Sequence, residues 1–593
     1  MAKAALSFEP FDCSIAKEVY CPLEEYQRHE EESKGKQAHF FEATDWGDLN
    51  YLSSEYDLYQ EKSFDKGIVI SNNQQPASEF LMPDDMQLDV FSSIIQDFFE
   101  EPVKLDAGLD CIEKSTNISN PEIDEYKKEK VHPIPSASLE LLNSYRTGNK
   151  ILNGEDFDNS TKEEPCQVVV CRHLSTEEVM RVAGARYIQF SVQTDDDLSM
   201  LGHPYSSMDS TLTDEETKDV ELGHLLLASA EKIGIQQYDR ASKLLTQCEH
   251  MSSNFGNPVQ RVVYHFSEAL RERINRETGR VSSKGPKNGK WREDIKEVMM
   301  SPHPALLASH QMLPFGQVAQ FTAIQAILDN MTSAKRVHLI DLGIRIGMQW
   351  TILMQALAVR FTCPIELLKI TAVGTPQGKI EETGERLVSF AKTLNLPFTF
   401  KPVVVSDMKD LNRDLFELAP EEAVGIYAPW MLHTMICRPE CLDHLMRVIR
   451  SFNPCIMVVT EIEANLNSPS FVNRFIEALF FYSAWFDCYD TCMDRNDHNR
   501  MSIEGIFFSH GIRNIVTAEG SERIVRHVGI DVWRSFFARF RFVEIELNHL
   551  YQASLLLKQF ACGSSCTLDM NGKSLSTGWK GTPLLAISAW KLK

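Results

Sequence analysis

One stretch of the sequence, residues 337–350, constrains the fold more than any other. It reads VHLIDLGIRIGMQW: five residues of strand character that end at Asp341, a turn with two glycines, and a run of helix formers over 349–360. A nearly continuous apolar strand is typical of a parallel sheet covered on both faces, and an acid at its end would lie at the carboxyl edge, where such folds place ligands. The stretch therefore predicts the opening of a βαβ unit.

The sequence after this stretch continues to alternate between strand and helix patterns. Strands are predicted at 366–373, 398–405, 423–427 and 455–460, and helices at 378–394, 440–450, 468–485 and 530–539. This alternation predicts a parallel sheet with right-handed crossovers and helices on both faces. Two late segments, 542–547 and 584–590, predict strands that pair antiparallel at one edge. Helical periodicity over 220–332 predicts a helical region ahead of the first strand.

The charge divides the chain into two parts. The first 219 residues carry 19 Lys and Arg against 45 Asp and Glu, a net charge of −26, whereas the remainder carries 41 against 38, a net charge of +3. Because the acidic part shows no sustained apolar periodicity, we expect most of residues 1–215 to be disordered. The nearly neutral remainder lacks the positive charge expected of a protein that grips DNA on its own.

Two segments of the acidic part nevertheless have helical patterns. Residues 85–101 interleave aromatic and aliphatic side chains with acids, and in 175–189 Ser175 and Glu178 have the spacing of a capping box. Each segment would either fold on a partner or dock on the chain's own globular part, because periodicity does not distinguish the two.

Targeting signals are sparse. No apolar run is long enough to span a bilayer, and the first ten residues lack the pattern of a secretory signal, so we expect an intracellular protein whose 14 cysteines are reduced thiols. Residues 280–292 hold five bases and no acid, which suits a nuclear-import signal, a phosphate contact or a solvated loop.

Several motifs resemble those of the GRAS proteins of plants, which regulate transcription. VHLID at 337–341 with the following QW is similar to the VHIID signature, and LLAISAW at 584–590 is similar to the SAW signature. Further matches are LPF at 396–398, IRNIVTAEGSERIVRH at 512–527 and YQASLLL at 551–557. The residues that carry the two main signatures are Val337, His338, Leu339, Ile340, Asp341, Gln349, Trp350, Ser588, Ala589 and Trp590.

The resemblance implies a fold and a domain plan. It implies an α/β GRAS domain over 216–593, with an α-helical cap on a Rossmann-like core of methyltransferase type, after a largely disordered acidic region over 1–215. The family's subregions would be leucine-rich region I at 220–280, the VHIID region at 300–366, leucine-rich region II at 378–415, a PFYRE-like region at 423–515 and the SAW region at 516–593.

The resemblance also implies a cellular role. Proteins of this family act in the nucleus, with DNA-binding transcription factors and with other GRAS proteins as homo- or heterodimers, so contact with DNA would be mainly indirect and no membrane is involved. The chain contains no DELLA sequence, and VHPIP at 131–135 is not a convincing form of the second gibberellin-receptor motif. Direct control by that receptor is therefore not expected.

An LxxLL sequence lies within the first leucine-rich segment. Its leucines, Leu222, Leu225 and Leu226, are candidates for insertion into a groove of a partner protein. The alternative is that they belong to the core of the helical region, which is the common use of such a stripe.

A methyltransferase that uses S-adenosylmethionine is the alternative function. Its cofactor needs small residues after the first strand and an acid at the end of the second. Asp341, Gly343 and Gly347 fit a D-x-G-x-G-x-G pattern, but Arg345 occupies the middle position, where the GRAS family usually has glycine. The second strand ends in VGT at 373–375 without an acid, and APWM at 428–431 offers neither Asp nor Asn. We therefore expect no cofactor and no catalytic residues.

Metal-binding patterns are weak. His433, Cys437, Cys441 and His444 would share one helix face, but Pro439 interrupts the helix, so no zinc site is expected. The pairs Cys488 with Cys492 and Cys562 with Cys566 are too loosely spaced to predict a site from sequence.

Overall fold

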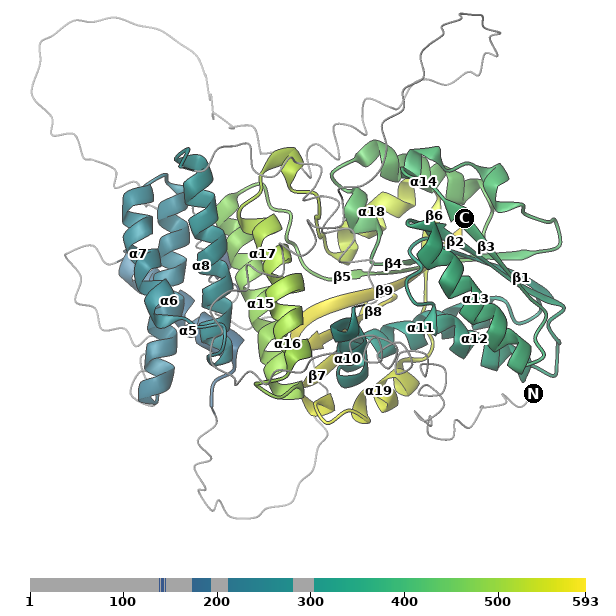
Figure 1. The fold of residues 1–593 in the computed structure, drawn as a ribbon, viewed down its shortest axis with the longest axis horizontal. Helices are drawn as coiled ribbons and strands as arrows, with labels where there is room; N and C mark the ends of the chain where they lie inside the picture. The colour runs from purple at the N-terminus through teal and green to yellow at the C-terminus, as the bar shows by residue number, and fades with distance from the viewer. Residues whose placement is uncertain (1–137, 139, 143, 145–172, 193–211, 281–302) are drawn as a thin grey trace, which may run out of the picture. The chain divides into compact units, whose positions relative to one another are not determined.

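The computed structural model describes residues 138, 140–142, 144, 173–192, 212–280 and 303–593, with the backbone alone for 189–192 (Figure 1). The segments at 85–101, 131–135 and 281–292 lie outside the described residues. Within the described ranges, no helix combines the length and the apolar character needed to cross a bilayer.

Five parallel strands form the first part of the sheet. They are β1 (Arg336–Asp341), β2 (Leu367–Gly374), β3 (Phe398–Val404), β4 (Ala423–Pro429) and β5 (Ile456–Ile462), in the spatial order β3-β2-β1-β4-β5. This is the strand order of the Rossmann fold over its first five strands. The predicted parallel sheet is therefore confirmed.

Four antiparallel strands complete the sheet of the described residues. They are β6 (Phe542–Ile545), β7 (Cys566–Asn571), β8 (Ser574–Trp579) and β9 (Thr582–Leu592). Strand β9 pairs with β5 on one side and with both β6 and β8 on the other. The antiparallel pairing of the two late segments is confirmed, but the expectation that 584–590 lies at an edge is wrong. All of 584–590 is buried, as suits a strand covered on both faces and paired on both sides.

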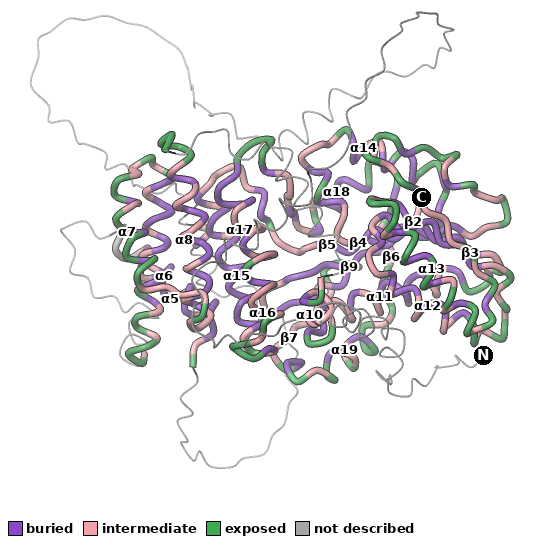
Figure 2. Tube along the Cα trace, viewed as in Figure 1, coloured by how far each residue is buried: buried purple, intermediate pink, exposed green. Residues whose placement is uncertain are grey.

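Helices cover both faces of the sheet (Figure 1). On one face lie α11 (Pro314–Asn330), α12 (Met348–Ala358), α13 (Gln377–Thr393) and α19 (Leu550–Lys558), and on the other lie α14 (Pro439–Ser451) and α18 (Ile530–Arg539). Successive residues of β1 point into opposite cores, with Leu339 in the first and Ile340 in the second. Figure 2 shows the resulting buried centre of the sheet.

A helical cap is built from two separate parts of the chain. Helices α6 (Asp214–Gly234), α7 (Tyr238–Met251) and α8 (Pro258–Glu277) precede the sheet, whereas α15 (Phe471–Cys492), α16 (His498–Ser502), the π-helical η6 (Ile503–Phe508) and α17 (Ser509–Val516) follow β5. Together they enclose one apolar core. The predicted helical region over 220–332 also contains α10 (Pro304–Met312), which ends just before Pro314 opens α11.

Helix α5 (Thr176–Val192) packs on this cap. Its start has the predicted capping box, because Glu178 N donates to Ser175 Oγ at 3.3 Å and Ser175 N donates to the Glu178 carboxylate at 2.7 Å. Met180 and Ala183 are fully buried in the cap core, and the Tyr187 hydroxyl donates to Glu231 at 2.6 Å. Of the two alternatives for 175–189, the structure thus shows docking on the chain's own globular part.

Candidate functional site

The carboxyl group of Asp341 is fully buried at the end of β1. It accepts hydrogen bonds from Gly343 N at 3.0 Å, from Gln349 Nε2 at 3.1 Å and from Trp350 Nε1 at 2.8 Å. Burial raises the pKa of Asp341 to about 6, although these three donors act in the opposite direction. The acid of the predicted site is therefore engaged by its own turn and by the first residues of α12.

The two glycines of the turn, Gly343 and Gly347, lie where a side chain would be disfavoured by the backbone conformation or by close neighbouring atoms. Gly347 has a φ of +70° at the start of α12, and a Cβ there would lie 2.9 Å from Thr383 Cγ2. A Cβ on Gly343 would lie 3.4 Å from the Pro429 carbonyl oxygen, so the ends of β1 and β4 approach closely. The turn is thus packed against protein atoms of α13 and β4.

Arg345 reaches from this turn toward the end of β4. Its guanidinium carbon lies 5.6 Å from the centre of the Trp430 ring, and its charge acts on both Asp341 and Tyr427. The Arg345 carbonyl is fixed by the Thr383 hydroxyl at 2.9 Å. A cationic side chain therefore lies at the carboxyl edge between β1 and β4, which is where a nucleotide-type cofactor would bind in such a fold.

The neighbouring strand ends offer little to hold such a cofactor. Strand β2 ends at Gly374 with no acid, and α13 begins at Gln377. After β4, Trp430 has a φ of +48° and donates its backbone N–H to Thr460 O at 2.8 Å.

A buried cluster of His433, Glu461 and His527 lies beyond the end of β4, and sequence reasoning missed it. One potential ligand atom of each lies within 4.8 Å of the other two, a donor set that metal ions use in proteins. However, Glu461 Oε1 accepts the backbone N–H groups of Met431 and Leu432 at 3.1 and 2.8 Å, and Oε2 bonds His433 Nδ1 at 2.7 Å. Both carboxylate oxygens are thus used to hold the turn after β4, and we interpret the cluster as structural.

The side chains of His433, Cys437, Cys441 and His444, which an uninterrupted helix would place on one face, lie apart in the structure. Cys437 Sγ contacts Ile524 O at 3.4 Å, Cys441 Sγ contacts Asp407 at 3.5 Å, and His444 Nε2 bonds Leu411 O at 2.8 Å. Each side chain has a separate neighbour because Pro439 starts α14 between Cys437 and Cys441.

The residues of the two main family signatures are framework residues. His338 has no exposed surface, bonds Thr371 Oγ1 at 2.7 Å and Glu422 at 3.0 Å, and has its pKa lowered to about 4, mainly by burial. Trp350 packs edge-on against Tyr427, and Trp590 against Phe537. The other signature residues lie in β1, α12 and β9 and are buried as well: Val337, Leu339, Ile340, Asp341, Gln349, Ser588 and Ala589.

Of the two alternatives for the LxxLL leucines, a partner's groove or the core of the helical region, the structure places Leu222 and Leu226 in the cap core. Leu222 and Leu226 expose 2% and 0% of their surface, and Leu225 is half-buried against the same core. Leu222 and Leu226 cannot enter a partner's groove without opening the cap, because α6 turns this side toward its neighbouring helices.

Comparisons with known proteins agree with this architecture. A family model described as the GRAS domain family matches residues 222–591. DELLA protein GAIP of Cucurbita maxima is 32% identical over 388 residues, which cover 64% of each chain. DELLA protein RGL1 of Arabidopsis thaliana is 32% identical over 392 residues, which cover 65% of this chain and 73% of that protein. The chain thus spans about two thirds of the length of these curated relatives, slightly less for the first.

A solved structure shares the fold. The crystal structure of SCL7 of Oryza sativa matches 62% of this chain and 99% of its own, with a TM-score of 0.55 at 26% sequence identity. The matched part corresponds in extent to the cap and the sheet, so the fold expected from the sequence is confirmed.

Proposed function

This chain belongs to the GRAS domain family, and from that membership we propose that it is a plant transcriptional regulator that acts in the nucleus through contacts with other proteins. Its partners would be DNA-binding transcription factors and other GRAS proteins, as homo- or heterodimers. DNA would be reached mainly through those partners, since residues 220–593 carry a net charge of only +3.

The state of the carboxyl edge is the observation that carries this proposal. Asp341 is enclosed by three donors from its own turn and helix, and Arg345 extends across the edge to Trp430. A Rossmann-like core with this edge taken up by its own side chains supports a role as a scaffold for macromolecular contacts, because function resides in the site and not in the fold.

A reporter assay tests the regulatory role. The full chain, fused to a heterologous DNA-binding domain, is expected to change transcription from a reporter in plant cells, whereas the unfused chain should have no effect on the same promoter. Equal reporter output with the fusion and with the DNA-binding domain alone would contradict the proposal. Binding of bare DNA at physiological salt by the purified chain would contradict its indirect mode of action.

Methyl transfer remains the alternative function because the sheet has the corresponding strand order. Calorimetry with S-adenosylmethionine separates the two. We expect no binding in the micromolar range, because the side chain of Arg345 lies in the turn whose backbone would have to contact the cofactor. Micromolar binding that is lost in Asp341→Asn but retained in Glu366→Gln, a surface control, would support the enzyme instead.

A further inference from the structure

Strand β7 is an end strand of the sheet, and among the described residues it pairs with β8 alone. The turn between the two strands has two residues, Gly572 and Lys573, and Asn571 pairs with Ser574 across it. The residues that flank a two-residue turn form a hydrogen-bonded pair, and such pairs alternate with non-bonded pairs along an antiparallel ladder. Every second residue of β7 therefore directs its backbone N–H and C=O groups away from β8: Cys566, Leu568 and Met570.

Most of these outward groups have no partner in the part of the chain that the structure describes. The N–H of Cys566 donates to Gly563 O and closes the short helix η8 (Gly563–Ser565). For Leu568 and Met570, no hydrogen bond from another described element reaches the outward N–H or C=O. A strand edge of this kind is a template on which a further strand can pair.

The opposite end of the sheet is protected against such pairing, and the β7 end is not. Strand β3, at the other end, contains Lys401 and Pro402, residue types that keep edge strands from pairing with other chains. Strand β7 reads CTLDMN and contains no Pro, Lys or Arg. Its one charged residue is Asp569, which lies between Leu568 and Met570 and whose backbone faces β8. The sheet is therefore open to strand addition at β7.

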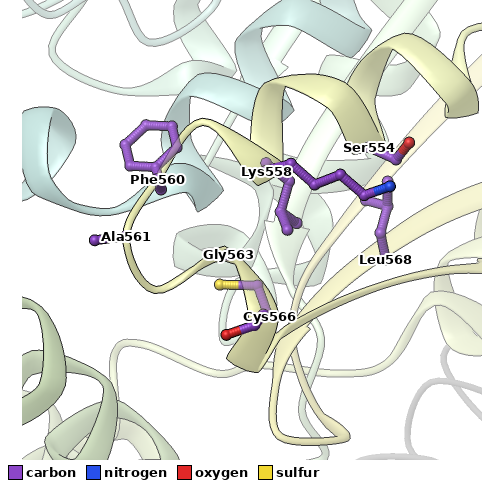
Figure 3. Close-up of a pocket in the computed structure, with 9 residues that line it drawn as sticks. Ser554, Lys558, Phe560, Ala561, Gly563, Cys566 and Leu568 are labelled. Atoms are coloured by element: carbon purple, nitrogen blue, oxygen red, sulfur yellow. The ribbon is translucent and has the colours of Figure 1, made fainter.

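A pocket lies beside this edge, on the side of the sheet that α19 covers. The half-buried side chains of Cys566, Leu568 and Met570 all contact the core on that side. Cys566 and Leu568 also line a pocket of about 530 Å³, together with Ser554 and Lys558 of α19 (Figure 3). Because side chains alternate between the two faces of a strand, every second side chain of an added strand would point toward this pocket.

The surface of α19 next to the pocket indicates what kind of segment would fit. Tyr551 and Leu555 expose 69% and 43% of their surface and lie three or four residues from the pocket residues Ser554 and Lys558, so they share one helix face with them. Lys558 is the one charged side chain that lines the pocket. A complementary segment is thus apolar at alternate positions and carries an acidic side chain for Lys558.

We propose that β7 is a docking edge for an extended segment of a partner protein, which adds to the sheet as a further strand. Its backbone pairs with Leu568 and Met570, its alternate apolar side chains cover the pocket, and an acidic side chain pairs with Lys558. The main-chain hydrogen bonds supply affinity, whereas the pocket and Lys558 select the sequence. This inference rests on the proposed function, for which it supplies one surface of contact with another protein.

Panning of a phage-displayed library of short random peptides on the full chain provides the probe. We expect enrichment of peptides with apolar residues at alternate positions and at least one Asp or Glu. The most enriched peptide is then synthesised with a fluorescent label, and fluorescence polarisation measures its affinity. Methylation of a peptide backbone nitrogen that faces β7 should lower the affinity at least about tenfold, whereas methylation of the nitrogens between them should have little effect.

Variants of the edge itself complete the test. Leu568→Pro removes an outward N–H that β8 does not use, so it should lower the affinity at least about tenfold while the sheet remains folded. Leu568→Val is the matched control, because it keeps both the N–H and an apolar side chain, and its affinity should stay within about threefold of the wild type. Lys558→Glu should weaken binding of the acidic peptide and favour a version with Lys in place of the acid.

Three results would each overturn the proposal: no enriched peptide, equal affinity of the wild type and Leu568→Pro, or enriched peptides with helical periodicity. A dimer of the free chain that Leu568→Pro dissociates in sedimentation velocity would also overturn it and assign the edge to a second copy. Circular dichroism checks the fold of each variant, and the methylated peptides decide the matter if Leu568→Pro is not folded. A fusion that changes reporter transcription when no peptide is enriched would remove the docking edge and leave the proposed function intact.

Discussion

At the residue scale, the carboxyl edge of the sheet is defined by buried polar groups that the protein satisfies itself. Asp341 and Glu461 lie at the ends of β1 and β5, positions from which such sheets contact ligands. Both accept hydrogen bonds from backbone N–H groups of the turn beside them, Asp341 from Gly343 and Glu461 from Leu432. Side chains that the fold would otherwise use for ligands therefore stabilise turns.

The raised pKa of Asp341 predicts a pH dependence of stability. Between pH 3.8 and about 6 the folded chain keeps a proton on Asp341 that the unfolded chain has released. The free energy of unfolding should therefore fall as the pH rises through this window, by roughly 3 kcal/mol at most, and level off above it. Asp341→Asn removes this contribution. The free energy of unfolding of the wild type, minus that of the variant, should therefore decline from pH 4 to 6. Urea denaturation at each pH measures it.

A difference that stays constant from pH 4 to 7 would contradict this expectation. It would mean that the N–H donors of Gly343, Gln349 and Trp350 stabilise the carboxylate enough to cancel the effect of burial.

Glu504 is a further buried acid, and it neutralises two arginines in the cap. Its Oε2 lies 3.0 Å from Arg261 Nε and 2.7 Å from Arg500 Nη1, and both arginines are fully buried. Glu504→Gln keeps the size but removes the charge, so we expect the free energy of unfolding to fall by about 3–5 kcal/mol. Chemical denaturation monitored by circular dichroism measures this loss.

The exposed pair of Lys335 and Glu366 is the control for that change. Its charged atoms are 3.1 Å apart, but more than half of each side chain is exposed. Glu366→Gln should therefore cost less than about 1 kcal/mol. Equal losses from Glu504→Gln and Glu366→Gln would show that the buried cluster contributes no more than a surface pair.

At the element scale, hydrophobic periodicity predicted a strand or helix correctly where the buried residues of that element follow the same periodicity. The strands β1 to β5 and helix α18 were placed within two residues, because their apolar runs reflect burial on the faces they present. Strands β7 and β8 were missed, since CTLDMN and SLSTGW mix polar and apolar residues without alternation. Strand β7 is partly buried at the end of the sheet, and β8 buries the polar Ser574 and Thr577 along with its apolar residues. Helices α16 and α17 were missed because they pack on helices that are distant in the sequence, α16 on α10 and α17 on α8.

The start of α12 depends on a single backbone conformation. Gly347 has a φ of +70°, and a Cβ would lie 2.9 Å from Thr383 and 3.3 Å from Leu387. Gly347→Ala should therefore lower the free energy of unfolding by at least about 1–2 kcal/mol, from the left-handed conformation alone. Thermal denaturation measures the change.

Gly378 provides a matched control on the helix that Gly347 faces. It lies in α13, and a Cβ there would meet no neighbouring atom within 4 Å, so Gly378→Ala should be neutral or stabilise by up to about 1 kcal/mol. A similar change in the free energy of unfolding in both variants would contradict this expectation. It would indicate that the turn after β1 accommodates a side chain at Gly347.

At the scale of the whole molecule, the sequence predicted the sheet and the cap but not how they meet. Asp487 of α15 joins them: it bonds Thr176 N at 3.1 Å, Trp579 Nε1 at 2.6 Å and Lys580 Nζ at 2.7 Å. Contacts of this kind join α5, α15 and β8. Hydrophobic periodicity within one segment does not predict them, because the residues in contact are far apart in the sequence. The same reason explains why the His433 cluster was not predicted, since its members come from separate segments.

The contacts of α5 predict that the folded part of the chain begins before α6. A chain that starts at residue 173 keeps α5, whereas one that starts at 212 loses it and uncovers apolar surface of the cap that Val179, Met180 and Ala183 bury. We expect the shorter chain to unfold more easily by at least about 3 kcal/mol, since each buried side chain of this size contributes about 1–3 kcal/mol. It should also lose the hydrogen bonds that Tyr187 and Thr176 make with Glu231 and Asp487. Denaturation of the two chains side by side measures the difference. Equal stabilities would place α5 outside the cooperative unit and return the start of the folded part to α6, as the match of the family from residue 222 suggests.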